Sequence, residues 1–281
     1  MRDLENQVIL ITGATSGLGQ RVARDLAGQG ATILLHGRNP QKGQDTLQEI
    51  QQATGSQKLT YYNADLAALD DVRRLAAEIL SGQPRLDVLI NNAALGAGQR
   101  QGGREQSRES YELRFAVNYL APFLLTHQLL PLLQRSAPAR VVNVASVGQQ
   151  PLDFDDVMLE HSYDGLRAYR QSKLAQVMYT FDLAEQLRGS GVAVNCLHPA
   201  TLMDTQMVQK SNYFGGPQRT VDEGAQALEY LAVSPELDGV TGEYFNGQQR
   251  GRANAMAYDP AARRRLWELS EQLVGIRPPG R

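Results

Sequence analysis

Residues 8–19 read Val-Ile-Leu-Ile-Thr-Gly-Ala-Thr-Ser-Gly-Leu-Gly, and this stretch decides the fold. The apolar, β-branched run Val8–Thr12 predicts a buried strand, and a helical pattern follows at Leu18–Gln29. Between them, glycines let the backbone turn sharply and approach a pyrophosphate without a Cβ in the way. The helix N-terminus adds free N–H groups and a partial positive charge. The stretch therefore predicts a strand–turn–helix unit that binds a dinucleotide.

The same alternation of short strands and longer helices continues along the chain. Strands are predicted at Val8–Thr12, Thr32–His36, Leu59–Asn63, Val88–Asn91, Arg140–Val144, Val192–Leu197 and roughly Glu243–Phe245. Helices are predicted at Leu18–Gln29, Gln41–Ala53, Leu69–Leu80, Ser110–Gln134, Gly165–Arg188, Val221–Val233 and about Pro260–Leu273. Several strands are apolar almost throughout, which is typical of strands covered on both faces. We therefore predict a doubly wound, Rossmann-type α/β fold with a mainly parallel, seven-stranded sheet in a single domain.

Two segments do not fit the alternation. Gly96–Arg108 is rich in Gly, Gln and Arg and is predicted to be a surface loop. Thr201–Arg219 combines a possible Gly215-Gly216 hinge with four apolar side chains, a pattern that favours a lid over a bound ligand. Those apolar side chains are Met203, Met207, Tyr213 and Phe214.

The bulk composition limits the classes of partner. A net charge of −2 argues against a nucleic acid or an anionic membrane as partner. No stretch has 18 uninterrupted apolar residues, so we expect no membrane anchor and a cytoplasmic location. The four His and the single cysteine, Cys196, show no ligand spacing, so we expect no metal site. Cys196 lies in an apolar run and is expected to be a small buried hydrophobe.

Thr12, Gly13, Gly17 and Gly19 form the pattern Thr-Gly-x-x-x-Gly-x-Gly. With this pattern the chain resembles the short-chain dehydrogenase/reductase family, whose nucleotide turn has the same spacing. Further motifs occur in the family's order: Asp65-Leu66, Asn91-Asn92-Ala93-Ala94, Asn118, Ser146, Tyr169-x-x-x-Lys173 and Pro199-Ala200. Ala94 and Ala200 stand where the family usually has glycine.

The resemblance covers nearly the whole chain and is closest to the retinol-dehydrogenase-like branch. It rests on Phe115–Thr126, on the long spacer from Ser146 to Tyr169, on Ala168–Ala175 and on the tail Ala262–Trp267. It implies a nucleotide-binding half up to about residue 145 and a catalytic and substrate-binding half over about 146–281. Cofactor contacts are expected from Gly13, Thr15, Ser16, Gly17, Leu18, Gly19, Arg38, Asp65, Leu66, Asn92, Ala93, Ala94, Tyr169, Lys173, Pro199 and Thr201.

The implied chemistry is hydride transfer between nicotinamide and a carbonyl or alcohol. Reducing a ketone needs a proton donor whose pKa is not far above the working pH, and free tyrosine is too weakly acidic. Lys173 lies one helical turn after Tyr169, so its charge is expected to lower the tyrosine pKa, and it can also bind the nicotinamide ribose. Taken singly, Tyr169 and Lys173 also fit a surface pair on a helix.

Two further residues complete the expected catalytic set. Ser146 ends the fifth predicted strand, at the carboxyl edge where doubly wound sheets bind ligands, and its hydroxyl is expected to orient the substrate oxygen. Its other reading is a serine that ends a strand at a turn. Asn118 matches the helix asparagine that, in relatives, supports a proton relay through a kink. Without the resemblance, a buried asparagine with a structural hydrogen bond fits equally well.

The end of the second predicted strand indicates which nicotinamide cofactor is preferred. NAD-selective relatives carry an acidic residue there, whereas this chain reads His36-Gly37-Arg38-Asn39. Gly37 cannot repel a 2′-phosphate, and Arg38 can bind one with its planar fork of donors. NADPH is therefore expected, with NADH the weaker cofactor, although Arg38 also fits an exposed strand end.

Three classes of function remain open from the sequence. The first is an NADP(H)-dependent carbonyl reductase or alcohol dehydrogenase acting on a small, largely apolar substrate. The second is a reductase of a conjugated C=C bond, because the same Tyr and Lys serve that reaction. The third is a non-catalytic nucleotide-binding regulator on the same fold. A homodimer or homotetramer is expected, because the two longest predicted helices carry more apolar positions than one sheet face needs.

Overall fold

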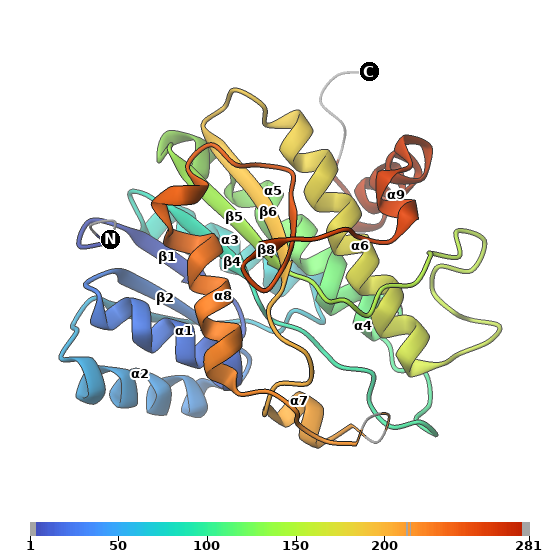
Figure 1. The fold of residues 1–281 in the computed structure, drawn as a ribbon, viewed down its shortest axis with the longest axis horizontal. Coiled ribbons are helices and arrows are strands. Elements are labelled where there is room, and N and C mark those ends of the chain that lie inside the picture. Colours follow the sequence, from blue (N-terminus) through green and yellow to red (C-terminus); the bar gives the residue numbers. More distant parts are fainter. Residues whose placement is uncertain (1–3, 212, 214, 277–281) are drawn as a thin grey trace.

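The computed structural model describes residues 4–211, 213 and 215–276. Its centre is one sheet with the strand order β3-β2-β1-β4-β5-β6-β7-β8 (Figure 1). The strands are β1 Val8–Ile11, β2 Thr32–Gly37, β3 Leu59–Asn63, β4 Val88–Asn91, β5 Ala139–Val144, β6 Val192–His198, β7 Tyr244–Asn246 and β8 Gln249–Arg250. The first seven pair in parallel, as predicted.

The predicted count of seven strands is wrong by one. β8 is an antiparallel strand of two exposed residues that turns back on β7 through Gly247. A polar Gln-Arg pair gives no apolar signal, so the hydrophobic pattern could not reveal it.

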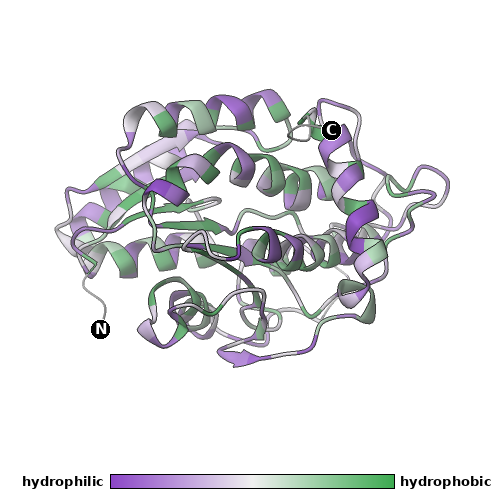
Figure 2. Cartoon of the chain, turned by 90° about the horizontal axis from the view of Figure 1, so that it is seen from above, coloured by the Kyte–Doolittle hydropathy of each residue, from purple (hydrophilic) through white to green (hydrophobic). Residues whose placement is uncertain are grey.

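Helices cover both faces of the sheet, which confirms the doubly wound prediction. α1 (Gly17–Gly28), α2 (Pro40–Thr54) and α8 (Val221–Val233) lie on one face, and α3 (Leu69–Gly82), α5 (Ala121–Arg135) and α6 (Gly165–Gln186) lie on the other. Along β1, Ile9 and Ile11 pack into the first layer, whereas Leu10 packs into the second. In Figure 2 hydrophobic residues run through the middle of the molecule along the central strands. Burial on both faces explains why these strands are apolar throughout.

The long helix predicted at Ser110–Gln134 starts later and contains a kink. Ser110 has a φ of 67°, which a helix cannot accommodate, and Glu112 caps α4 (Leu113–Phe115) by accepting a hydrogen bond from the backbone of Phe115. A π-helical turn, η1 (Ala116–Leu120), then joins α4 to α5. The other predicted helices begin and end within two residues of the observed ones.

The continuous helical stretch Leu113–Arg135 is long and apolar enough to cross a membrane. In its most apolar window, 78% is buried inside the protein. The stretch therefore forms part of the core of this fold.

The C-terminal helix α9 (Pro260–Val274) lies across α5 and α6, outside the second layer. Its Trp267 contacts the rings of Phe123, His127 and Tyr179, with centroids 5.2 to 5.8 Å apart. Arg263 of α9 pairs with Asp182 of α6 at 3.2 Å. The extra apolar positions on these helices are thus covered by the chain itself, and they no longer argue for pairing of two subunits.

Candidate active site

The glycine-rich turn between β1 and α1 is built so that side chains would not fit. Gly13 has a φ of 66°, and a Cβ there would lie 2.8 Å from the Cα of Ala93. A Cβ on Gly19 would lie 2.5 Å from the carbonyl oxygen of Gly13. Thr15 and Ser16 are partly exposed, whereas Leu18 packs into the core below the turn. The backbone therefore stays open at the N-terminus of α1, which fits the pyrophosphate of a dinucleotide.

The turn is tied to the end of β4 by Thr12 and Asn92. The Thr12 hydroxyl accepts hydrogen bonds from the backbones of Asn92 and Ala93, at 2.9 and 3.0 Å. The Asn92 amide donates to the carbonyl oxygens of Thr12 and Gly13, at 2.8 and 3.2 Å. The predicted cofactor residues Asn92, Ala93 and Ala94 thus lie directly beside the glycine turn, at the switch point between β1 and β4.

His36, which belongs to no motif in the sequence, also holds the glycine turn. Its Nδ1 lies 3.3 Å from the backbone nitrogen of Gly13, and its Nε2 lies 3.1 Å from the carbonyl oxygen of Ala64. Burial lowers the pKa of this ring to about 4, so it is neutral at physiological pH. A histidine at a strand end carries no motif, and its partners are distant in the sequence.

The end of β2 has the features expected for the adenosine end of a cofactor site. A Cβ on Gly37 would lie 2.6 Å from a methyl carbon of Thr15, so any side chain there would require Thr15 to shift. Arg38 is exposed, and its guanidinium makes no ion pair or hydrogen bond with the described residues. After β3, one oxygen of Asp65 accepts a hydrogen bond from the backbone of Ala67 at 3.0 Å, and Leu66 is buried.

Ser146 and Tyr169 meet beyond the carboxyl end of β5. The Ser146 hydroxyl accepts a hydrogen bond from the backbone of Gly148 at 3.0 Å, and a Cβ on Gly148 would lie 3.4 Å from that hydroxyl and 3.8 Å from the Tyr169 ring. Burial raises the pKa of Tyr169, and the neighbouring Ser146 hydroxyl partly offsets this. The carbonyl of Ser146 accepts from Gln149 and Tyr244, which fix the serine backbone.

Lys173 lies on the same helix but does not touch the Tyr169 hydroxyl in this structure. Its ammonium nitrogen is 5.9 Å from the centre of the tyrosine ring, and it donates to the Val144 carbonyl at 2.7 Å and to Gln176 Oε1 at 2.9 Å. Burial lowers the Lys173 pKa to about 7. Lys173 therefore makes no hydrogen bond to Tyr169 in this arrangement, and Gln176 is an additional partner of the lysine.

Asn118 lies in the π-helical turn, where the predicted kink occurs. The backbone of Ala121 donates to the carbonyl of Ala116, five residues back, which is the hydrogen bond of a π-turn. The Asn118 side chain bonds both the N–H and the carbonyl of Leu95, at 2.7 and 3.0 Å, and donates to the Ser172 hydroxyl at 2.9 Å. Asn118 thus joins the loop after β4 to the helix that carries Tyr169.

The segment predicted to be a lid crosses the open edge of the sheet. Pro199 is buried after β6, and the Thr201 hydroxyl lies 3.0 Å from Nε2 of His198. Within this segment, α7 (Gln206–Gln209) follows Thr205. The Thr205 side chain lies beside the glycine turn, because a Cβ on Gly17 would be 3.3 Å from its methyl carbon. Phe214, one of its predicted apolar residues, lies outside the described residues.

Comparison with known proteins agrees with this geometry. A family model described as short chain dehydrogenase matches residues 7–214. The chain belongs to the short-chain dehydrogenase family. Human retinol dehydrogenase 13 is 35% identical over 292 residues, covering 98% of this chain and 87% of that protein. This short-chain dehydrogenase therefore falls in the retinol-dehydrogenase-like branch, and membership makes it an oxidoreductase of the nicotinamide-binding type.

Solved structures also support the fold. An uncharacterized protein from Mycobacterium Paratuberculosis is 27% identical with a TM-score of 0.79, covering 100% of this chain and 97% of that one. A short chain dehydrogenase from Escherichia coli CFT073, solved as a complex with NADPH, is 30% identical with a TM-score of 0.71. That match covers 88% of this chain and 98% of the other.

Proposed function

We propose that this protein is an NADPH-dependent oxidoreductase that interconverts a carbonyl and an alcohol on a small, largely apolar substrate. The observation that carries the proposal is that Ser146 and Tyr169 both lie beside Gly148, beyond the end of β5. A Cβ on Gly148 would lie 3.4 Å from the Ser146 hydroxyl oxygen and 3.8 Å from the Tyr169 ring, and the buried Lys173 is one helical turn after Tyr169. A serine and a tyrosine that lie side by side can both reach a single substrate oxygen. Bound NADPH supplies the hydride for reduction, and NADP⁺ accepts it in the reverse direction.

Tyr169 is proposed to be the general acid and base. In reduction its hydroxyl gives a proton to the carbonyl oxygen, and in oxidation the phenolate takes that proton back. Ser146 donates a hydrogen bond to the same oxygen and stabilises its developing charge. Because the Gly148 N–H occupies an acceptor site of Ser146, the serine proton is left for Tyr169 or for the substrate.

Lys173 and Asn118 are proposed to support the proton transfer. The Lys173 side chain binds the nicotinamide ribose, and in its protonated form it favours the phenolate of Tyr169. Asn118 keeps the π-turn and the Leu95 loop in place, and this kink belongs to the proton relay that the resemblance implies. Most cofactor contacts are assigned to the turn and strand ends up to about residue 145. Tyr169, Lys173, Pro199 and Thr201 add contacts from the half over about 146–281, which is assigned to catalysis and substrate binding.

An apolar substrate is supported by two exposed apolar side chains. Among the described residues, Val147 and Met207 are two of only three large apolar side chains that are exposed. Val147 follows Ser146 directly. Met207, in the predicted lid segment, lies against Gly96 in the loop after β4. The relatives named retinol dehydrogenase act, by their names, on an apolar alcohol, and we extend this substrate class to the present chain.

The proposal is tested by following NADPH consumption against a panel of aldehydes, ketones, quinones and enones. Turnover of aldehydes or ketones that is lost in Tyr169→Phe supports it. Turnover of enones alone supports the alternative C=C reductase. NADPH binding without turnover of any compound, or of the matching alcohols with NADP⁺, supports the regulatory alternative.

Self-association, the cytoplasmic location and the absence of a membrane anchor or a metal remain predictions. Because α9 covers the outer side of α5 and α6, a homodimer or homotetramer needs a surface other than this helix pair. Light scattering at micromolar concentration tests self-association, since a mass of 30.9 kDa is that of one chain.

A further inference from the structure

Arg114 is a buried arginine outside the predicted catalytic set, and it contacts the backbone of the active-site loop. Only 5% of this residue is exposed, and it lies one helical turn before the buried Asn118. Its Nε donates to the carbonyl of Gly96 at 2.9 Å. Asn118 bonds the neighbouring residue Leu95 through both backbone groups. Two side chains of one helix thus hold two consecutive residues of the loop that follows the cofactor motif Asn92-Ala93-Ala94.

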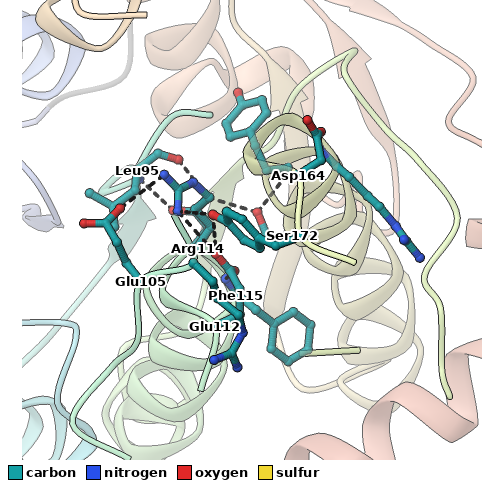
Figure 3. A network of polar contacts seen from close by, with 12 residues as sticks. Leu95, Glu105, Glu112, Arg114, Phe115, Asp164 and Ser172 are labelled. Atoms are coloured by element: carbon teal, nitrogen blue, oxygen red, sulfur yellow. Dashed lines mark hydrogen bonds and ion pairs between the residues drawn. The ribbon is translucent and has the colours of Figure 1, made fainter. Parts of the chain in front are cut away.

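The guanidinium of Arg114 is itself fixed by partners from three segments (Figure 3). Nη1 lies 3.3 Å from Oε1 of the buried Glu112 and donates to the Tyr163 hydroxyl at 2.6 Å. Nη2 lies 3.3 Å from Glu105, a carboxylate at the surface. The planar fork has enough donors to serve all of these acceptors and Gly96 together, which a lysine does not.

The loop held in this way forms a wall of the proposed active site. A Cβ on Gly96 would lie 2.7 Å from the side chain of Met207 in the lid, so the loop and the lid are in contact. The carbonyl of Ala97 would lie 2.3 Å from a Cβ on Gly165, the first residue of the helix that carries Tyr169 and Lys173. Gly96 and Ala97 therefore lie between the cofactor motif, the lid and the catalytic helix.

We propose that Arg114 is a positioning residue of the active site, which holds the Leu95–Gly98 loop against the catalytic helix from behind. This inference rests on the proposed function, because the geometry it protects is that of hydride transfer. Displacing reacting groups by about 1 Å costs as much as 10²-fold in rate. Loss of Arg114 is thus expected to slow the chemical step, while the glycine turn that binds the cofactor phosphates is untouched.

The test compares Arg114→Ala with Arg140→Ala. Arg140 is equally buried and donates to the carbonyls of Leu231 and Ser234, but it lies at the amino end of β5, opposite the active site. The measurements are kcat with NADPH and with NADPH deuterated at the transferred position, the Kd of NADPH, and the melting temperature. Each assay is run far below the melting temperature of the less stable variant.

For Arg114→Ala we expect kcat to fall roughly 10- to 100-fold, with a larger isotope effect and a nearly unchanged Kd of NADPH. Arg114 also lines a pocket of about 440 Å³ that is partly open to solvent, so added guanidinium ions can reach the vacated site. We expect guanidinium, below denaturing concentrations, to restore part of kcat in this variant only. Arg140→Ala should lower the melting temperature but leave kcat and the isotope effect near wild type.

A kcat for Arg114→Ala equal to that of Arg140→Ala overturns the proposal, as does a loss that guanidinium does not restore. If the alanine variant does not fold, because Glu112 is left as an unpaired buried carboxylate, Arg114→Lys carries the test. Lysine keeps the charge and loses the fork, so an unchanged isotope effect in that variant overturns the proposal.

Failure of the proposed function is separable from failure of this inference. If the wild-type enzyme turns over no compound of the panel, the proposed function fails. Hydrogen exchange of the Leu95–Gly98 amides then tests the clamp without turnover. Faster exchange there in Arg114→Ala, but not in Arg140→Ala, supports the clamp, and equal exchange in both overturns it.

Discussion

The backbone N–H of Gly13 donates a hydrogen bond to Nδ1 of His36, and the two nitrogens are 3.3 Å apart. Because Nδ1 accepts, the ring proton is on Nε2 and is donated to the carbonyl of Ala64. One neutral imidazole thus links the cofactor turn after β1, the end of β2 and the segment after β3. Protonation of Nδ1 would remove the acceptor that Gly13 uses.

This relationship predicts that acid destabilises the fold. Burial lowers the His36 pKa from 6.5 to about 4, so between these pH values the unfolded chain binds a proton that the folded chain does not. The free energy of unfolding should therefore be at its full value above pH 6.5. It should fall by on the order of 3 kcal/mol as the pH drops to about 4.

Urea unfolding at pH values between 7 and 4 measures this loss. His36→Leu removes the titrating ring, so its stability should depend less steeply on pH in the same window. His198, whose pKa burial also lowers to about 4, remains in the variant and keeps part of the slope. Identical slopes for the variant and the wild type would assign the acid sensitivity to other groups.

Gln176 is predicted to set the pH range over which Lys173 works. Its Oε1 accepts from the Lys173 ammonium at 2.9 Å, which favours the protonated amine. Gln176→Leu should move the alkaline limb of kcat/KM to lower pH. Gln176→Glu places a carboxylate at the same distance and should move it to higher pH. The measurement is kcat/KM against pH for both variants, and a shift in the same direction for both would contradict the assignment.

Tyr169→Phe should abolish turnover and leave cofactor binding nearly intact. The change removes only the hydroxyl, and loss of a general acid costs on the order of 10²–10⁴ in rate. Single-turnover kinetics with NADPH measures the chemical step, and a direct titration measures the Kd. A variant that keeps more than about a tenth of the wild-type rate has another proton donor.

The sequence predicts the layered fold because the central strands are buried on both faces and their apolar runs are continuous. It also brings Ser146, Tyr169 and the glycine turn to one sheet edge, because the carboxyl ends of parallel strands lie together. The predicted start of the long helix, Ser110, is three residues too early, because serine is a residue type that commonly caps helices. The positive φ of Ser110 and the cap at Glu112 are visible only in the structure.

His36 and Arg114, which belong to no sequence motif, both contact residues that are distant in the sequence. His36 contacts Gly13 across 23 positions, and Arg114 contacts Tyr163 across 49. Such partners are brought together by the strand order and by the approach of α4 to α6, which the periodicity of each element does not encode. Their chemistry is therefore visible only in the assembled fold.

Preference for NADPH over NADH is the prediction that depends most directly on one side chain. The position where an acidic residue would select NADH is Gly37, which has no side chain to repel a 2′-phosphate. Arg38 follows at the exposed end of β2, and its guanidinium makes no ion pair within the described residues. It can therefore bind a 2′-phosphate without giving up another partner.

Arg38→Leu should weaken NADPH binding and leave NADH binding little changed, because only NADPH carries the 2′-phosphate. A hydrogen bond to a charged group contributes about 1.5–3 kcal/mol, or roughly 10- to 150-fold in affinity. Titrating both cofactors into the wild type and the variant measures the four Kd values. Repeating the NADPH titration at high salt should shrink the difference between the two proteins, since the contact is exposed and therefore screened. Tighter binding of NADH by the wild type, or equal losses for both cofactors in the variant, would place Arg38 outside the cofactor site.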